Sequence, residues 1–296
     1  MQRIQGIIPP MVTPFCADGS IDEEALRAEV RFMIKTGVHG LAVCGSTGEG
    51  HTLSDEETRR ITEWTTDEAA GRIPIITGII TNSTDSAVRR AQAIADLGPA
   101  ALQVTPVHYV FRPGDDDMYR HFDTIADRTG IPVIIYNVIP WSYLMPPLLT
   151  RILRDSPGVI GVKQSASDMK ALADLLLLCG EAGILDRVRI LSAVDALLQP
   201  SFVLGSHGAI AAILTAVPDW CVALWNAVRA GDSANSLRLH RNLLRLWNAI
   251  EGPNLPANVR TVMHARGREG GLPRPPMSPS SPEQTWRIHA ALAAAE

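Results

Sequence analysis

Short apolar runs alternate with amphipathic segments along most of the chain. Eight runs are rich in Val, Ile, Leu and Ala, at residues 6–12, 40–44, 73–79, 101–104, 133–136, 159–162, 188–191 and 208–212. Most of them are nearly continuous rather than alternating between apolar and polar residues. Such runs are typical of parallel strands that are covered on both faces. The pattern therefore predicts eight buried parallel strands.

The segments between these runs predict helices with defined ends. Ser20 with Glu23, and Ser54 with Glu57, have the spacing of a capping box. Glycines at 37 and 71 are expected to end these two helices. Further helices are predicted at 85–97, 116–129, 147–155, 168–179 and 195–204. Eight strands with helices between them predict an α/β fold of the (β/α)8 TIM barrel type.

Four more helical segments follow the eighth run, at 219–230, 233–251, 256–266 and 282–294. A barrel of this type takes roughly 250 residues. We therefore expect residues 1–230 to form the barrel and residues 231–296 to form a C-terminal helical extension. A doubly wound sheet is the alternative, but PPMVTPFCADG follows the first run. A glycine-rich dinucleotide-binding fingerprint would be expected at that place.

Composition and charge narrow the class of protein further. The chain has 296 residues and a net charge of −4, and no basic stripe with interleaved aromatics, so no nucleic-acid partner is expected. Its apolar runs are too short to cross a bilayer, and its first residues lack the apolar core of a signal peptide. The four cysteines are scattered. These features predict a cytoplasmic protein with reduced thiols and no membrane partner.

Lys163 follows the apolar run 159–162 directly, at the end of a strand where a barrel carries its chemistry. Of the 27 residues that are Lys or Arg, only Lys35, Lys163 and Lys170 are lysine. An arginine would supply the charge alone, whereas a lysine amine can lose its proton and attack a carbonyl carbon. The alternative is a lysine that extends from the strand end into solvent.

Other strand ends supply further candidate residues. Tyr136 ends the neighbouring run and could transfer protons, or could only pack at the rim. The loop GSTGEG offers the Ser46 and Thr47 hydroxyls and its N–H groups to a carboxylate or phosphate, or is a plain turn. Glu49 could act as a base, but its carboxylate is rather expected to accept N–H groups of the loop and so stabilise that turn. The sequence shows no spacing typical of metal ligands, so neither a metal nor a cofactor is expected.

The strand ends PPMVTPF, GSTGE, TPVHYVFRP, YNVIP, GVKQS and GSHGAIAA occur in an order and spacing that resemble the dihydrodipicolinate synthase and N-acetylneuraminate lyase superfamily. The resemblance covers the chain from about residue 5 through the C-terminal helices. It implies a class I aldolase-type lyase in which Lys163 forms a Schiff base with pyruvate or a related 2-oxo acid. It also implies that Tyr136 shuttles protons, that Ser46 and Thr47 bind the carboxylate, and that the backbone near Ile210 lines the pocket. The family typically forms homotetramers built as dimers of dimers.

Several positions depart from the family pattern. The loop YNVIPWSYLMPP has no arginine where the synthase uses one to bind its second substrate, and KQS replaces KEA. The family's tyrosine that reaches a neighbouring subunit corresponds to either His108 or Tyr109. We therefore expect a lyase other than the synthase proper. The alternatives are synthase activity, a regulatory barrel that binds 2-oxo acids without turnover, and a barrel enzyme that grips a phosphate with GSTGEG.

Overall fold

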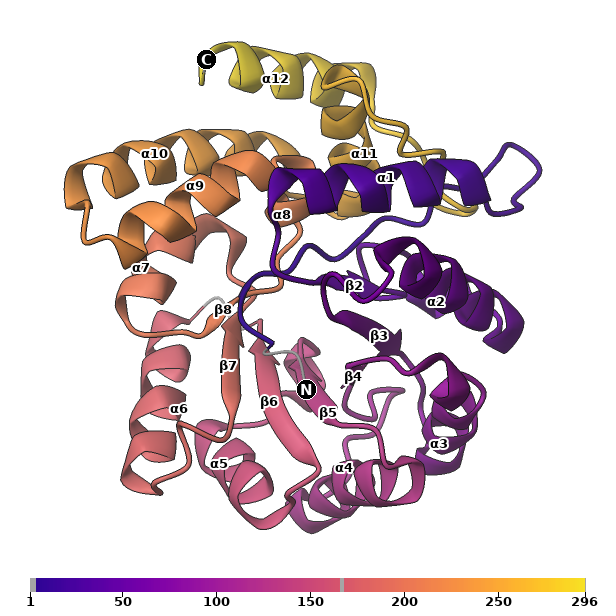
Figure 1. Ribbon diagram of the computed structural model, residues 1–296, viewed down its shortest axis with the longest axis vertical. Helices are drawn as coiled ribbons and strands as arrows, with labels where there is room; N and C mark the ends of the chain where they lie inside the picture. The colour runs from indigo at the N-terminus through magenta and orange to yellow at the C-terminus, as the bar shows by residue number, and fades with distance from the viewer. Residues whose placement is uncertain (1–3, 166–167, 296) are drawn as a thin grey trace.

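In a computed structural model that describes residues 4–165 and 168–295, eight parallel strands form one sheet enclosed by helices (Figure 1). The strands follow the order β1-β8-β7-β6-β5-β4-β3-β2. A parallel bridge between Pro10 and Ala42 joins the segment after β1 to β2, so hydrogen bonding continues across the remaining seam. The predicted α/β fold of the TIM barrel type is confirmed.

The strands agree with the apolar runs in place and differ from them in length. Their bounds are β1 Gly6–Ile7, β2 Leu41–Val43, β3 Ile75–Ile79, β4 Ala101–Val104, β5 Val133–Asn137, β6 Val159–Gln164, β7 Arg189–Ser192 and β8 Gly208–Ala209. β1 is shorter than the run 6–12 because Pro9 and Pro10 have no N–H to donate to a ladder. β6 is longer than predicted, so Lys163 lies within the strand rather than after it.

The barrel helices are α1 Glu23–Thr36, α2 Asp55–Ala69, α3 Thr84–Gln92, α4 Asp115–Thr129, α5 Pro146–Asp155, α6 Met169–Glu181 and α7 Leu198–Val203. The capping box of Ser54 and Glu57 is confirmed at the start of α2. The one predicted at Ser20 is wrong, because Asp22 caps α1 by accepting from the Ala25 N–H. The carboxylate of Asp22 is two residues closer to the helix than the Ser20 hydroxyl and satisfies the same free N–H groups.

Five helices follow β8: α8 Ile213–Ala216, α9 Pro218–Arg229, α10 Ser233–Ile250, α11 Leu255–Ala265 and α12 Pro282–Ala293. Figure 1 shows α9 to α12 gathered on one side of the barrel next to α1. One apolar cluster contains Leu26 of α1, Leu243 of α10 and Val259 of α11. The C-terminal helices therefore share a core with the barrel helices. The boundary at residue 230 between a barrel and a C-terminal extension stays a prediction.

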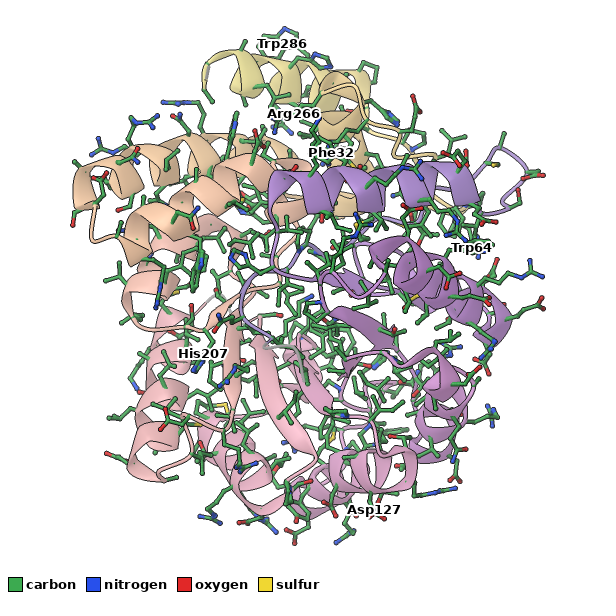
Figure 2. The ribbon with its side chains drawn as sticks, viewed as in Figure 1. Phe32, Trp64, Asp127, His207, Arg266 and Trp286 are labelled. Carbon is green, nitrogen blue, oxygen red and sulfur yellow. The ribbon has the colours of Figure 1, made fainter. Side chains whose placement is uncertain are left out.

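Apolar side chains fill both the barrel and the layer around it. Ile8, Ile76, Ile134 and Leu191 belong to the cluster inside the barrel and are fully buried. Outer side chains such as Trp286 on α12 point away from this core (Figure 2). Within the described residues, no helix has both the length and the apolar character needed to cross a bilayer. The strand ends are thus held on a rigid, densely packed frame.

Candidate active site

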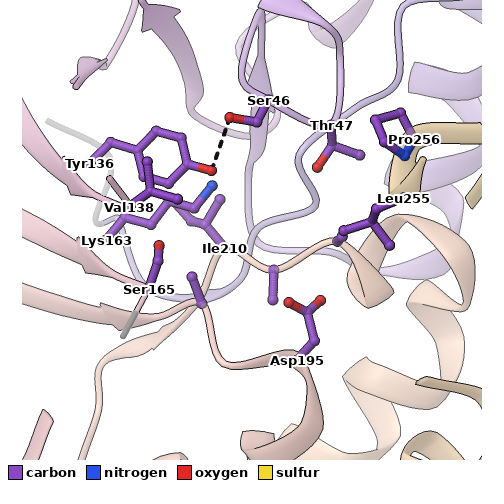
Figure 3. Close-up of a pocket in the computed structure, with 13 residues that line it drawn as sticks. Ser46, Thr47, Tyr136, Val138, Lys163, Ser165, Asp195, Ile210, Leu255 and Pro256 are labelled. Carbon is purple, nitrogen blue, oxygen red and sulfur yellow. Dashed lines mark hydrogen bonds between the residues drawn. The ribbon is translucent and has the colours of Figure 1, made fainter. Parts of the chain in front are cut away.

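A cavity of about 290 Å³ opens where β5, β6 and β8 end, and the loop after β2 forms part of its wall. All five residues that the sequence analysis placed at the site with an assigned role line this cavity (Figure 3): Lys163, Tyr136, Ser46, Thr47 and Ile210. They come together because parallel strands of a barrel end on the same face.

Lys163 places its amine inside the cavity. Lys163 is only 3% exposed, and its Nζ lies 3.7 Å from the centroid of the Tyr136 ring. The two residues are register partners on β5 and β6, so they project from the same face of the sheet. No ion pair joins Lys163 to a carboxylate of the described residues. The amine is therefore not tied to a fixed anionic partner and is free to meet a ligand.

Tyr136 links the lysine to the loop after β2. Its hydroxyl donates a hydrogen bond to Ser46 Oγ at 3.2 Å, which is the dashed line in Figure 3. The ring of the same side chain contacts the Lys163 amine. The Tyr136 side chain thus contacts the amine through its ring and the Ser46 hydroxyl through its own hydroxyl, a group that can donate or accept a proton.

The loop at residues 45–50 is closely packed rather than flexible. A Cβ added to Gly48 would lie 2.7 Å from Met11 O, and one added to Gly50 would lie 1.9 Å from Cys44 O. Both neighbours are backbone atoms, so a larger residue at either position would displace the chain. Thr13 Oγ1 donates to Gly48 O at 2.7 Å. The loop therefore presents the Ser46 and Thr47 side chains to the cavity in a fixed arrangement.

Asp195 is a cavity residue that the sequence analysis missed. It begins a short 3-10 helix after β7 and accepts a hydrogen bond from the Ile213 N–H at 2.8 Å. Burial raises the pKa of Asp195 to about 6, while the Ile213 N–H and the charge of Lys163 act in the opposite direction. The sequence could have pointed to Asp195, because it is an acidic residue three positions after the seventh strand, and all strands of a barrel end at the same mouth.

A neutral hydrogen-bond network fixes the loop after β5. Asn137 Nδ2 donates to Gln164 Oε1 at 2.9 Å, and Gln164 Nε2 donates to the Tyr143 hydroxyl at 2.7 Å. Asn137 also bonds both the N–H and the carbonyl of Leu144. The glutamine of KQS therefore holds the loop YNVIPWSYLMPP in place beside the cavity, and it does so without adding a charge.

His108 and Tyr109 lie in the loop after β4, outside the cavity of this chain. Tyr109 is 74% exposed. The ring nitrogen Nδ1 of His108 lies 3.0 Å from Pro106 O. The backbone carbonyl of His108 accepts a hydrogen bond from Trp141 Nε1 at 2.7 Å. Neither side chain is brought to Lys163 within one chain, so their assignment to the proton-relay position stays a prediction.

No group of three or more His, Cys, Asp or Glu side chains within residues 4–165 and 168–295 is arranged to hold a metal ion. A lysine amine at the mouth of a TIM barrel, beside a tyrosine and a pair of hydroxyls, is the arrangement that a class I aldolase-type lyase requires. Comparison with known proteins shows to which family the chain belongs. Residues 3–295 match the dihydrodipicolinate synthetase family, and the chain belongs to this family.

Relatives and solved structures cover nearly the whole chain. The 4-hydroxy-tetrahydrodipicolinate synthase of Thermodesulfovibrio yellowstonii is 36% identical, over 96% of this chain and 97% of that protein. The crystal structure of dihydrodipicolinate synthase from Aquifex aeolicus has a TM-score of 0.90 at 28% identity, with 98% of each chain covered. An E. coli prophage protein of the dihydrodipicolinic acid synthase family, in complex with pyruvate, has a TM-score of 0.92 at 26% identity and covers 99% of this chain and 98% of that one. The relatives' names give no support to our prediction of a lyase other than the synthase proper.

Proposed function

We propose that the protein is a lyase in which Lys163 forms a Schiff base with pyruvate or a related 2-oxo acid. The observation that carries this proposal is the Lys163 amine, buried in a cavity beside Tyr136 without a carboxylate partner among the described residues. The similar E. coli protein in complex with pyruvate supports the choice of a 2-oxo acid.

The cavity provides a role for each of its polar groups. The Ser46 and Thr47 hydroxyls hold the carboxylate and so direct the ketone carbon toward Lys163 Nζ. The amine adds to that carbon, and the resulting carbinolamine loses water to give the iminium. Tyr136 donates the proton that the leaving hydroxyl needs and recovers one afterwards. The iminium then accepts the electron pair of a bond broken at the adjacent carbon, or stabilises the carbanion that forms a new one.

Reductive trapping tests this function directly. Incubation with pyruvate and borohydride, followed by peptide mass spectrometry, is expected to label Lys163 alone. Lys170 is the internal control, because its side chain is 75% exposed and reacts if labelling is only a matter of access. Labels confined to Lys35 or Lys170, or no label with a series of 2-oxo acids, would overturn the proposal. Binding of pyruvate without a trapped adduct would instead favour the regulatory barrel.

Synthase activity is the second candidate, and the names of the relatives at 30–36% identity favour it. The loop after β5 favours another second substrate, because it has Trp141, Ser142 and Tyr143 where the synthase has an arginine. Asp195 adds a carboxylate to the same cavity. Incubation with pyruvate and the synthase's second substrate separates the two: formation of 4-hydroxy-tetrahydrodipicolinate identifies the synthase. Trapping at Lys163 without this product identifies a lyase with a different partner.

We also propose that the protein is a homotetramer, arranged as a dimer of dimers. Five exposed apolar residues support a contact between chains: Tyr109, Val110, Phe111, Trp141 and Met145. They lie on the loops after β4 and β5, which a hydrogen bond from Trp141 Nε1 to His108 O joins. Exposed apolar patches of this kind mark interaction surfaces.

A cytoplasmic location, without nucleic-acid or membrane partners, stays a prediction.

Replacing Phe111 with aspartate is expected to reduce the mass of the assembly in solution, because a charge would be buried in an apolar contact. Sedimentation velocity measures the mass. The control is Trp286→Asp on α12, which changes another exposed aromatic residue elsewhere on the molecule. An unchanged mass for the Phe111 variant would remove these loops from the contact.

A further inference from the structure

A buried ion pair joins the loop after β2 to the C-terminal helices. Glu49 Oε1 lies 2.6 Å from Arg260 Nη2, and the two side chains are 1% and 2% exposed. Burying two charges is costly and by itself is weak support for stability. Neither residue lines the cavity, yet Glu49 follows Ser46 and Thr47 in the same loop. The position of the pair therefore indicates a role connected with that loop.

Arg260 connects further segments to the same place. Its Nη2 donates to Thr13 O at 2.8 Å, and its Nε donates to Gly270 O at 3.0 Å. Thr13 in turn holds the loop through Gly48 O. Arg260 is one helical turn after Pro256, which lines the cavity from α11. The wall of the cavity and the support of its loop thus belong to one helix.

Arg274 binds the second oxygen of the same carboxylate. Its backbone N–H donates to Glu49 Oε2 at 3.0 Å. Its side chain fixes that stretch of backbone, because Nη2 donates to Glu57 Oε1 at 2.7 Å and the guanidinium lies 4.1 Å from the centre of the Phe15 ring. Both oxygens of Glu49 are therefore bound by the C-terminal part of the chain.

Glu49 itself has a backbone conformation that needs such support. Its φ of 54° and ψ of 35° lie in the left-handed region, which is costly for a residue other than glycine. Its N–H donates to Ser46 O at 3.0 Å. A change in the Glu49 backbone would consequently move the residues that carry the two cavity hydroxyls.

We propose that Glu49, Arg260 and Arg274 are positioning residues through which the C-terminal segment sets the Ser46 and Thr47 hydroxyls for the substrate carboxylate. This inference rests on the proposed function, since it concerns how the same 2-oxo acid is held. Lys163 and Tyr136 are held by β6 and β5, and the hydrogen bond from the Tyr136 hydroxyl to Ser46 connects them to the loop. Weakening the contact between Glu49 and the C-terminal residues is therefore expected to impair binding of the acid more than the subsequent chemistry.

The test is Glu49→Gln, which keeps the shape of the side chain and removes its charge. We expect KM for pyruvate to rise at least about tenfold, because small displacements of orienting groups have effects of this order. We expect kcat to change less than about threefold and Lys163 still to be trapped at saturating pyruvate. A merely structural role would lower the melting temperature without this difference between KM and kcat.

Glu29→Gln is the matched control. Glu29 pairs with Arg268 at 2.8 Å, both side chains are 5% exposed, and the pair also joins the barrel to the C-terminal segment. It lines no part of the active-site cavity. The control is expected to lose stability but to keep the wild-type KM. The proposal is wrong if KM of the Glu49 variant stays within about twofold of wild type, or if both variants raise KM equally.

A milder pair of variants keeps the test decisive if Glu49→Gln does not fold. Arg274→Ala changes a side chain that is 17% exposed and is expected to raise KM, with Arg274→Lys partly restoring it. Its control is Arg266→Ala in the same segment, whose side chain pairs with Asp219. If pyruvate never labels Lys163 in wild type, the proposed function fails, and pyruvate dissociation constants from calorimetry then replace KM in the same comparison.

Discussion

Replacing Lys163 with alanine is expected to abolish turnover and leave the barrel folded. The predicted loss is at least about 10⁴-fold in kcat, as when the nucleophile of a covalent mechanism is removed. The fold should survive because Lys163 forms no ion pair with the described residues, and the buried carboxylate of Asp195 keeps its hydrogen bond from the Ile213 N–H. Steady-state kinetics and a circular dichroism melt measure the two effects.

Lys163→Arg separates covalent chemistry from charge. Arginine keeps the positive charge beside the Tyr136 ring but forms no imine, so this variant should be as inactive as Lys163→Ala. Lys170→Arg, on the exposed face of α6, is the control and should retain wild-type rates. A rate near wild type in either Lys163 variant would remove the Schiff-base mechanism.

Replacing Tyr136 with phenylalanine is expected to lower kcat by about 10²- to 10³-fold, the usual contribution of a positioned proton donor. The aromatic ring stays beside Lys163 and only the hydroxyl that donates to Ser46 is lost. Imine formation and its subsequent steps should therefore slow while pyruvate still binds. Single-turnover kinetics with borohydride trapping measures the rate at which the adduct forms.

Tyr119→Phe on α4 is the matched control for this change. The Tyr119 side chain contacts the guanidinium of Arg151 on the outer face of the barrel and lines no part of the active-site cavity. The control should keep wild-type kinetics. If Tyr136→Phe forms the adduct at the wild-type rate, another group must move the proton.

The fold could be predicted because buried parallel strands leave a clear pattern of apolar runs. The same reasoning placed Lys163 and Tyr136 together, since strand ends of a barrel converge. Local details could not be read this way. Two successive prolines shorten β1, and Asp22 rather than Ser20 caps α1. In both cases several residues compete for one structural role, and the pattern alone does not decide between them.

The cavity was only partly predictable for a related reason. Leu255 and Pro256 line it from α11, and their approach depends on how distant helices pack. Glu49 was expected to accept N–H groups of its own turn, but its carboxylate binds Arg260 and Arg274. A sequence shows which residues can carry charge, whereas the partner of a buried charge is set by tertiary contacts more than 200 positions away.

The order of the cavity walls along the chain has a consequence for synthesis on the ribosome. The strand bearing the reactive amine is completed long before Leu255 and Pro256 leave the exit tunnel. A nascent barrel would thus hold Lys163 in a cavity that lacks the wall formed by Leu255 and Pro256 and is open to bulk water. The cavity is enclosed only once α11, which carries these two residues, has packed against the barrel, so it forms later than the strand that bears the nucleophile.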